Sequence, residues 1–132
     1  DEAMRLYPPA PGISMRQAVA EDELGDIRVP AGARIGVFPW ALQRHSALWD
    51  DPERFDPDRW ERAPRHRFAY IPFGAGPRVC IGQVMAITEI VLILATLAQH
   101  FRVRLAEGAR VGMQANITLR PTGLQMVVEP RR

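Results

Sequence analysis

The chain has 132 residues, enough for one ordinary domain, and its 17 basic residues, all arginine, nearly balance 15 acids to give a net charge of +2. A composition that is 47% hydrophobic and 24% charged is that of a globular protein, and it excludes a disordered, collagen-like or nucleic-acid-coating chain. The single cysteine excludes an internal disulfide framework and an all-cysteine zinc site.

The first part of the chain predicts a short helix followed by extended structure. Residues 2–6 are expected to end a helix, because the proline-rich stretch at 7–12 disfavours helical geometry. The sequence starts inside this helix without a methionine, so we interpret the start as a cut. Short apolar patterns at 13–20, 27–30 and 34–38, separated by turn signals, predict a small antiparallel sheet.

A loop and a long helix are expected next. Residues 40–48 include a predicted helical turn. Residues 50–67 show no helical or strand period, so they predict a long loop, which Phe55, Trp60 and Phe68 are expected to pack. Residues 81–99 predict a helix that is buried on most faces. A membrane span is the less favoured alternative, because Glu89 lies at its middle and basic flanks are missing.

The C-terminal half is expected to form strands and to be basic. Strands are predicted at 101–105, 115–119 and 124–129, with a turn at 121–123. Residues 67–132 hold 8 arginines against 3 acids, which fits an acidic protein partner as well as an ordinary solvated surface. No basic run interleaved with aromatics appears, so a nucleic acid is not expected as a partner.

The only cysteine, Cys80, lies in the stretch FGAGPRVCIG, just before the predicted long helix. The start of a helix favours a thiolate there, and the glycines at 74, 76 and 82 leave room for a flat ligand. Arg78 can pair with a carboxylate in fork geometry. Together these features suit an axial ligand, a porphyrin face and a propionate partner. From the residues alone, heme has only a modest lead over a redox-reactive thiol.

The same ten residues resemble the heme-binding signature of the cytochrome P450 family, Phe-x-x-Gly-x-Arg-x-Cys-x-Gly, at every fixed position. Downstream, Ala86 and Glu89 are similar to the Ala-x-x-Glu pattern of the helix that follows the cysteine. Upstream, residues 2–5 (EAMR) resemble the Glu-x-x-Arg motif of the family's K helix. Residues 52–55 resemble its PERF motif.

The resemblance implies an α+β fold class within a mainly helical parent fold. The chain would be the C-terminal heme-binding portion, residues 1–132, of a single cytochrome P450 domain whose N-terminal part is missing. Its parts would be the end of the K helix, a small antiparallel sheet, the meander loop, the cysteine loop, the long L helix and a C-terminal β-hairpin.

The resemblance also assigns roles to residues. Cys80 would be the metal ligand, and the cofactor would further be bound by Arg78, Phe73, Gly74, Gly76, Gly82 and Arg16. A structural charge network would consist of Glu2, Arg5 and Arg54. Residues adjacent to the substrate would be Ala10, Pro11, Gly12, Ile13, Ile117 and Thr118. No catalytic residue is expected in this part of the chain, because the oxygen-side helix precedes it in the family.

By this resemblance, the full protein would be a heme-thiolate monooxygenase containing heme b. It would insert one atom of O2 into a small apolar substrate, with electrons from a ferredoxin or a flavin reductase. The alternatives are a peroxygenase or isomerase-type enzyme of the same fold, and a non-heme thiol-redox or binding module. The expected location is the bacterial cytoplasm, with a membrane anchor left open, and the isolated fragment is expected to be inactive.

Overall fold

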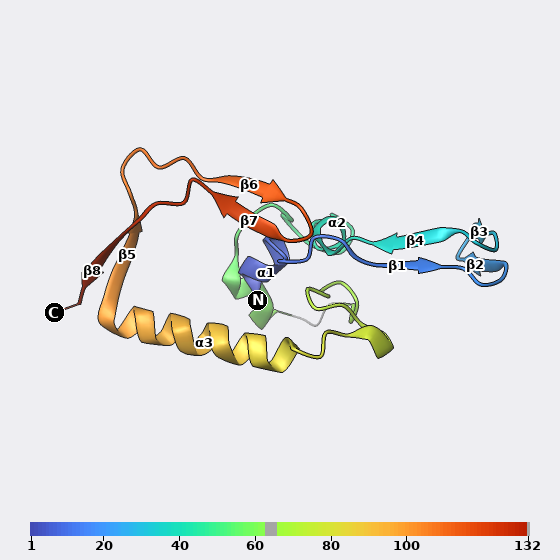
Figure 1. The fold of residues 1–132 in the computed structure, drawn as a ribbon, viewed down its shortest axis with the longest axis horizontal. Coiled ribbons are helices and arrows are strands. Elements are labelled where there is room, and N and C mark those ends of the chain that lie inside the picture. Colours follow the sequence, from blue (N-terminus) through green and yellow to red (C-terminus); the bar gives the residue numbers. More distant parts are fainter. Residues whose placement is uncertain (63–65, 132) are drawn as a thin grey trace. The chain divides into compact units, whose positions relative to one another are not determined.

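The computed structural model describes residues 1–62 and 66–131, with only the backbone described at Ile13 and Ser14. The chain forms two compact units, Asp1–Pro72 and Phe73–Arg132. The first holds α1 to η1 and the second holds η2 to β8 (Figure 1).

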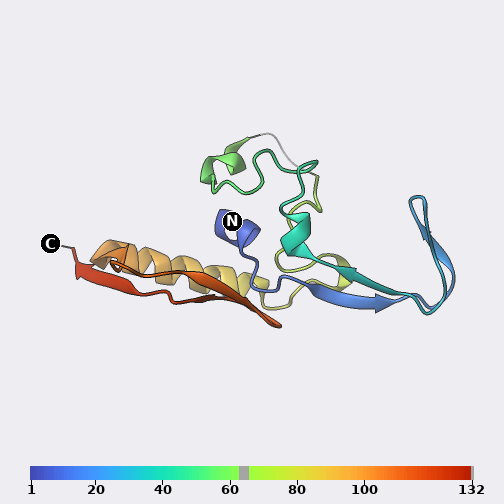
Figure 2. The same cartoon turned by 90° about the horizontal axis from the view of Figure 1, so that it is seen from above.

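The first unit begins with the expected helix, α1 (Glu2–Leu6). In place of one small sheet, it contains two antiparallel pairs of strands: β1 (Ile13–Gln17) with β4 (Arg34–Val37), and β2 (Asp22–Leu24) with β3 (Ile27–Val29). Residues 21–26 (EDELGD), which separate two of the predicted apolar patterns, contain β2, because Gly25 at φ 58° allows Gly25 and Asp26 alone to reverse the chain. The β2–β3 hairpin turns away from the line of β1 and β4 (Figure 2).

The rest of the first unit is the long loop, bounded by α2 (Pro39–Leu42) and containing the 3₁₀ helix η1 (Pro57–Glu61). The loop is packed, as expected, but mainly through its tryptophans. Trp49 is 1% exposed and meets Trp60 edge-on at 5.7 Å between ring centroids, and Trp60 meets Tyr70 at 4.6 Å. The predicted contribution of Phe55 and Phe68 is not found, since these residues are 59% and 42% exposed.

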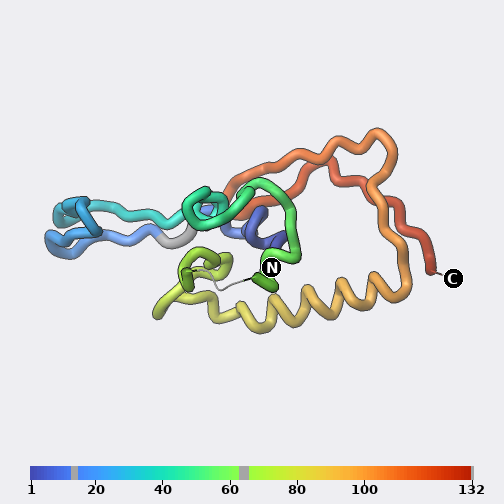
Figure 3. The backbone as a smooth tube through the Cα atoms, turned by 180° about the vertical axis from the view of Figure 1, so that it is seen from behind, coloured from blue at the N-terminus to red at the C-terminus, as the bar shows by residue number. Residues whose placement is uncertain are grey.

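The second unit contains η2 (Gly76–Arg78), α3 (Gln83–His100) and two antiparallel pairs of strands. The long helix leads directly into β5 (Phe101–Leu105), which pairs with β8 (Met126–Pro130) (Figure 3). Between them, β6 (Gly112–Ala115) and β7 (Leu119–Thr122) form a hairpin, and the predicted turn at 121–123 is wrong in part, because Pro121 and Thr122 belong to β7. The predicted strand at 115–119 is wrong, because residues 116–118 form the turn of this hairpin and Ile117, an apolar residue typical of strands, is 90% exposed there.

The expectation that the long helix is buried on most faces is also wrong for this chain. None of the residues of α3 is buried, and apolar side chains such as Val84 (78%), Leu92 (62%) and Leu94 (60%) are widely exposed. The reason is that the second unit supplies only strand pairs and a loop beside this helix. By length and composition, α3 is the one helix in the described ranges that is apolar enough to cross a membrane, as core helices of soluble proteins also are.

Candidate functional site: a buried charge network and the cysteine loop

A buried carboxylate, Glu2, organises the first unit. Its side chain is 2% exposed and accepts hydrogen bonds from two guanidiniums, those of Arg5 (2.9 Å to each carboxylate oxygen) and Arg59 (3.0 Å). The backbone N–H of Asp56 (3.0 Å) and the indole N–H of Trp60 (3.1 Å) also donate to it. Glu2 therefore joins α1 to the long loop more than fifty residues away.

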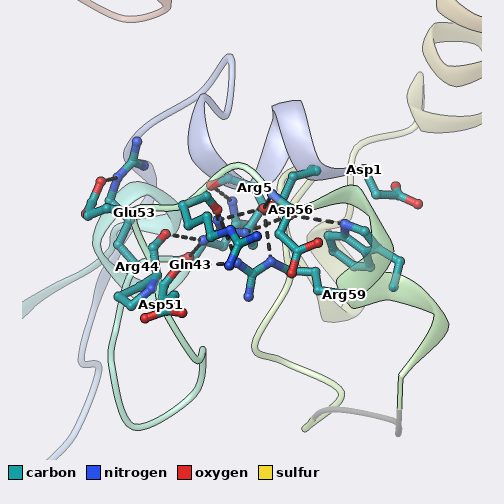
Figure 4. A network of polar contacts seen from close by, with 12 residues as sticks. Asp1, Arg5, Gln43, Arg44, Asp51, Glu53, Asp56 and Arg59 are labelled. Atoms are coloured by element: carbon teal, nitrogen blue, oxygen red, sulfur yellow. Dashed lines mark hydrogen bonds and ion pairs between the residues drawn. The ribbon is translucent and has the colours of Figure 1, made fainter.

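The two arginines use their remaining donors on backbone carbonyls. Arg5 donates through all five of its N–H groups, and Arg59 through at least four. Figure 4 shows both guanidiniums converging on the loop. The accepting carbonyls belong to Gln43, Asp50, Asp51, Pro52 and Arg54, at 2.7 to 3.2 Å. These dipoles offset the net positive charge of two guanidiniums around one carboxylate.

This environment shifts two pKa values. Burial opposes the charge on Glu2 and by itself would raise the pKa, but the hydrogen bonds from Arg5 and Asp56 and the charges of Arg5 and Arg59 lower it to about 2. The pKa of Tyr70 is raised to about 12 by burial and, to a lesser extent, by the negative charge of Glu2. Glu2 is thus held ionised and Tyr70 neutral over the ordinary pH range.

The expected network is present except for one member. Glu2 and Arg5 pair as predicted, but the third side chain is that of Arg59, and Arg54 contributes only its backbone carbonyl. Arg54 is exposed. The physical reason is that Arg59 lies on η1, which presents its side chain at 2% exposure to Glu2.

The cysteine loop opens the second unit and is closed by its own backbone. The N–H of Cys80 donates to the carbonyl of Phe73 at 2.9 Å, and η2 lies within the loop thus formed. Gly74 and Gly76 adopt φ of 80° and 70°, a backbone conformation that other residues rarely take. The loop sequence therefore fits this closed conformation, and substitution of either glycine would strain it.

The side chains of this loop leave the thiol accessible. Cys80 is exposed, and it precedes α3, whose N-cap is Gly82. A Cβ at Gly82 would meet the sulfur of Cys80 at 3.8 Å, and one at Gly76 would meet nothing within 4 Å. Arg78 is exposed and has no hydrogen bond or ion pair in the described part of the chain. The soft sulfur donor of Cys80, the open space at Gly76 and the unpaired guanidinium of Arg78 suit a heme with its propionates.

The other predicted site residues lie on other segments of the chain. Arg16 lies on β1 in the first unit, opposite Ile35 of β4, with its guanidinium exposed. The proposed substrate-adjacent residues divide between the units: Ala10, Pro11 and Gly12 lie before β1, whereas Ile117 and Thr118 lie in the turn between β6 and β7. The side chain of Ile13 is outside the described residues.

Comparison with known proteins decides the family of the chain. The family model described as Cytochrome P450 matches residues 1–128. The chain belongs to the cytochrome P450 family. Solved cytochrome P450 structures share its fold: the heme domain of cytochrome P450DA matches with a TM-score of 0.91 at 32% identity over 100% of this chain and 30% of that one. Retinoic acid-bound cyanobacterial CYP120A1 matches with a TM-score of 0.88 at 28% identity over 98% of this chain and 31% of that one.

Curated relatives include cytochrome P450 enzymes of Streptomyces. Cyclooctat-9-en-7-ol 5-monooxygenase of Streptomyces melanosporofaciens is 47% identical over 98% of this chain and 29% of its own length. Pentalenene oxygenase of Streptomyces avermitilis is 41% identical over 99% of this chain and 28% of its own length. The chain thus spans less than a third of the relatives that it matches.

Sequence reasoning missed three residues of the network. Arg59 and Trp60 do carry a sequence signal, because the pattern Pro-acid-Arg-aromatic occurs at 52–55 and again at 57–60. Gln43 had none, since a single glutamine after an apolar stretch is typical of many surfaces. Its side chain is nevertheless fully buried.

Proposed function

We propose that this chain is the cysteine-bearing part of a heme-thiolate monooxygenase of the cytochrome P450 family. The observation that carries the proposal is the loop from Phe73 to Gly82, which combines every fixed residue of the family's heme signature with an exposed thiol and open space at Gly76. The names of the relatives, a monooxygenase and an oxygenase, support the same activity.

In this proposal each loop residue has a role toward heme b. Cys80 would bind the iron as a thiolate, and Arg78 would pair with a heme propionate, a role proposed also for Arg16. The bound heme would activate O2 with electrons from a partner, aided by the electron-rich thiolate. Phe73 closes the loop by accepting the N–H of Cys80, while Gly74 and Gly76 give the backbone its turns and Gly82 leaves space beside the sulfur.

Thiolate ligation is tested in the full-length protein by adding carbon monoxide to the reduced form. We expect the strongly red-shifted Soret band of a thiolate ligand, and we expect Cys80→Ser to abolish it. Val79→Ala, which changes a neighbouring exposed side chain of the same loop, is the matched control and should keep the band. A wild-type spectrum typical of imidazole ligation would contradict the proposal.

The redox partner is proposed to be an acidic ferredoxin or flavin reductase. The second unit exposes Arg78, Arg102, Arg104 and Arg110, whereas its acids are only Glu89, Glu107 and Glu129. Such a surface attracts an acidic protein at low ionic strength. We expect the rate of electron transfer to fall as salt rises, and Arg110→Glu to lower it further. A salt-independent rate would exclude this docking surface.

The proposed substrate is a small apolar organic molecule. Two relatives are named for cyclooctat-9-en-7-ol and for pentalenene, and the residues proposed to be adjacent to the substrate include the apolar Ala10, Pro11 and Ile117. Turnover of a panel of substrates graded by polarity would test this.

We also propose a cytoplasmic location, supported by the bacterial sources of these relatives. Fractionation of cells expressing the full-length protein would test it.

A further inference from the structure

The ribbon formed by β5 and β8 has one apolar face and one charged face. Its register gathers apolar side chains on one side: Phe101, Val103, Leu105, Met126, Val128 and Pro130. The opposite side, the basic face, carries Arg102, Arg104, Val127 and Glu129. Arg131 extends the basic face beyond β8, because its N–H donates to the carbonyl of His100 at 2.7 Å and adds one pair to the ladder.

The two faces differ in how readily further segments of a protein can cover them. Val103 and Val128 are about half exposed, and covering them removes apolar surface from water, which is favourable. Covering the basic face would bury three guanidiniums with one carboxylate among them, which is costly. We therefore expect the basic face to remain in water in the full-length protein.

Two of the three arginines on the basic face are free to bind an anion. Arg104 is engaged, because its Nε donates to Oε1 of Glu129 at 3.2 Å, and this pair cancels one positive charge. Arg131 donates only through Nε, to the carbonyl of Phe101 at 3.1 Å, so both of its Nη groups remain. Arg102 is exposed and has no hydrogen bond or ion pair within residues 1–62 and 66–131. An open cleft of about 410 Å³ is lined by Arg102, Glu129, Pro130 and Arg131.

The chemistry of the basic face favours carboxylates over other anions of large partners. Guanidiniums hold carboxylates in fork geometry, and two of them flank the cleft. An anionic membrane is typically bound by clusters of about four to eight basic residues, whereas this face has an excess of two. The described side chains of the basic face include no aromatic ring on which a nucleic acid base could stack.

The basic face begins where α3 ends. The helix starts at Gln83, three residues after Cys80, and β5 follows directly after His100 (Figure 1). A helix of 18 residues is about 27 Å long. A partner held at Arg102 therefore makes this contact at the end of α3 that is opposite to the cysteine loop.

We propose that Arg102 and Arg131 form an anchoring site for an acidic segment of a partner protein. The inference rests on the proposed acidic redox partner and narrows one part of its docking surface to the end of α3. Carboxylates of the partner would pair with the two free guanidiniums, and salt would weaken this contact because both are exposed to solvent. The anchoring site would raise the local concentration of the partner without contacting the heme.

The test measures binding of a fluorescent polyglutamate peptide to the full-length, heme-loaded protein by fluorescence anisotropy at low salt. Arg102→Gln combined with Arg131→Gln removes both free guanidiniums. We expect about tenfold weaker binding, which corresponds to ~1.4 kcal/mol for two exposed ion pairs. Arg34→Gln combined with Arg54→Gln is the matched control, because it lowers the net charge equally at two exposed arginines of the first unit. The control should bind nearly as tightly as the wild type.

The same experiment contains the results that would overturn the anchoring site. These are a wild type that does not bind the peptide, equal affinities of the wild type and the Arg102/Arg131 variant, and equal weakening in both double variants. Binding to phosphatidylserine vesicles but not to the peptide would assign the basic face to a membrane instead. If the double variant does not fold, Arg102→Gln alone decides, since Arg102 has no bond to lose in the described part of the chain, and it should weaken binding about threefold.

The proposed function is checked separately in the same samples. The wild type and both double variants should keep the red-shifted Soret band of the reduced carbon monoxide complex, because none of the substituted residues is proposed to bind heme. A wild type without this band would refute the proposed function, whereas loss of peptide binding with the band retained concerns the anchoring site alone.

Discussion

Glu2, Arg5 and Arg59 depend on one another because one buried carboxylate faces two buried guanidiniums. Each side chain is at most 2% exposed, so none can exchange its partner for water if another is removed. Removing one member of such a buried group is strongly destabilising, because it leaves an uncompensated charge. The neighbouring Arg54 differs, since it takes part only through its backbone carbonyl.

Substitution by alanine should therefore have very different effects on stability at Arg59 and at Arg54. In the full-length protein, Arg59→Ala should lower the free energy of unfolding by about 3–5 kcal/mol, because Glu2 loses a donor and three loop carbonyls lose the guanidinium. Arg54→Ala should change it by less than about 0.5 kcal/mol, since alanine keeps the carbonyl. Denaturant unfolding would measure both. Equal losses would mean that the side chain of Arg54 has a role that its geometry does not show.

The pKa of Glu2 predicts an acid-sensitive contribution to stability. Its folded pKa of about 2 lies below the ordinary 4.5, so the stabilisation is complete above 4.5 and is lost as the pH falls toward 2. The loss is on the order of 3 kcal/mol. Unfolding midpoints measured across this window should fall steeply in the wild type and more gently in Glu2→Gln. Parallel curves would contradict the assignment to Glu2.

At the residue scale, the sequence predicted Glu2, Arg5 and the cysteine loop, because each belongs to a motif with fixed spacing. It could not separate Arg54 from Arg59, since both occupy the third position of the same four-residue pattern and only the packing of η1 decides between them. Gln43 was beyond prediction, because its partners are backbone groups, which carry no sequence signal.

At the scale of elements, prediction succeeded where local signals were unambiguous. The bounds of α1 and β5 were predicted to the residue. Prolines follow α1, and a change of hydrophobic period marks the start of β5. The hairpin of β6 and β7 was displaced, because an apolar isoleucine in its turn imitates a strand residue. Hydrophobic periodicity alone cannot distinguish an apolar turn residue from an apolar strand residue.

A matched pair of glycines tests the turn between β7 and β8. Gly123 has φ 66°, and a Cβ there would collide with the carbonyl oxygen of Arg110. Gly108 has φ 74°, but a Cβ would meet nothing within 4 Å. Gly108→Ala should therefore lower the free energy of unfolding by about 1–2 kcal/mol, through backbone strain alone. Gly123→Ala should lower it clearly more, because the collision adds to the strain. Denaturant unfolding of the full-length protein would compare them, and equal costs would exclude the collision.

At the scale of the whole molecule, the exposure of α3 is the main departure from expectation. An apolar helix with no buried residue is expected to pack against further segments of a protein. The chain spans only 29% of the relative with which it shares 47% identity. Composition correctly predicted an apolar helix of this length. It could not show which segments cover the helix, because the chain itself contains too few of them.

We therefore expect the isolated 132-residue chain neither to hold heme firmly nor to turn over substrate. Its apolar helix should bind a hydrophobic dye far more strongly than the full-length protein does, because a large apolar patch is exposed. Dye fluorescence and heme titration of both proteins at equal concentration would test this. Stable, stoichiometric uptake of heme by the isolated chain would contradict it.

The long loop around Asp51 is held mainly through its backbone carbonyls. The guanidiniums of Arg5 and Arg59 bind carbonyls of residues 50–54, so this segment is fixed through its acceptors. Amide hydrogen exchange reports on N–H groups, and Pro52 has none. Exchange mapping of the full-length protein would thus underrate the rigidity of this segment, whereas isotope-edited carbonyl infrared spectroscopy would detect it directly.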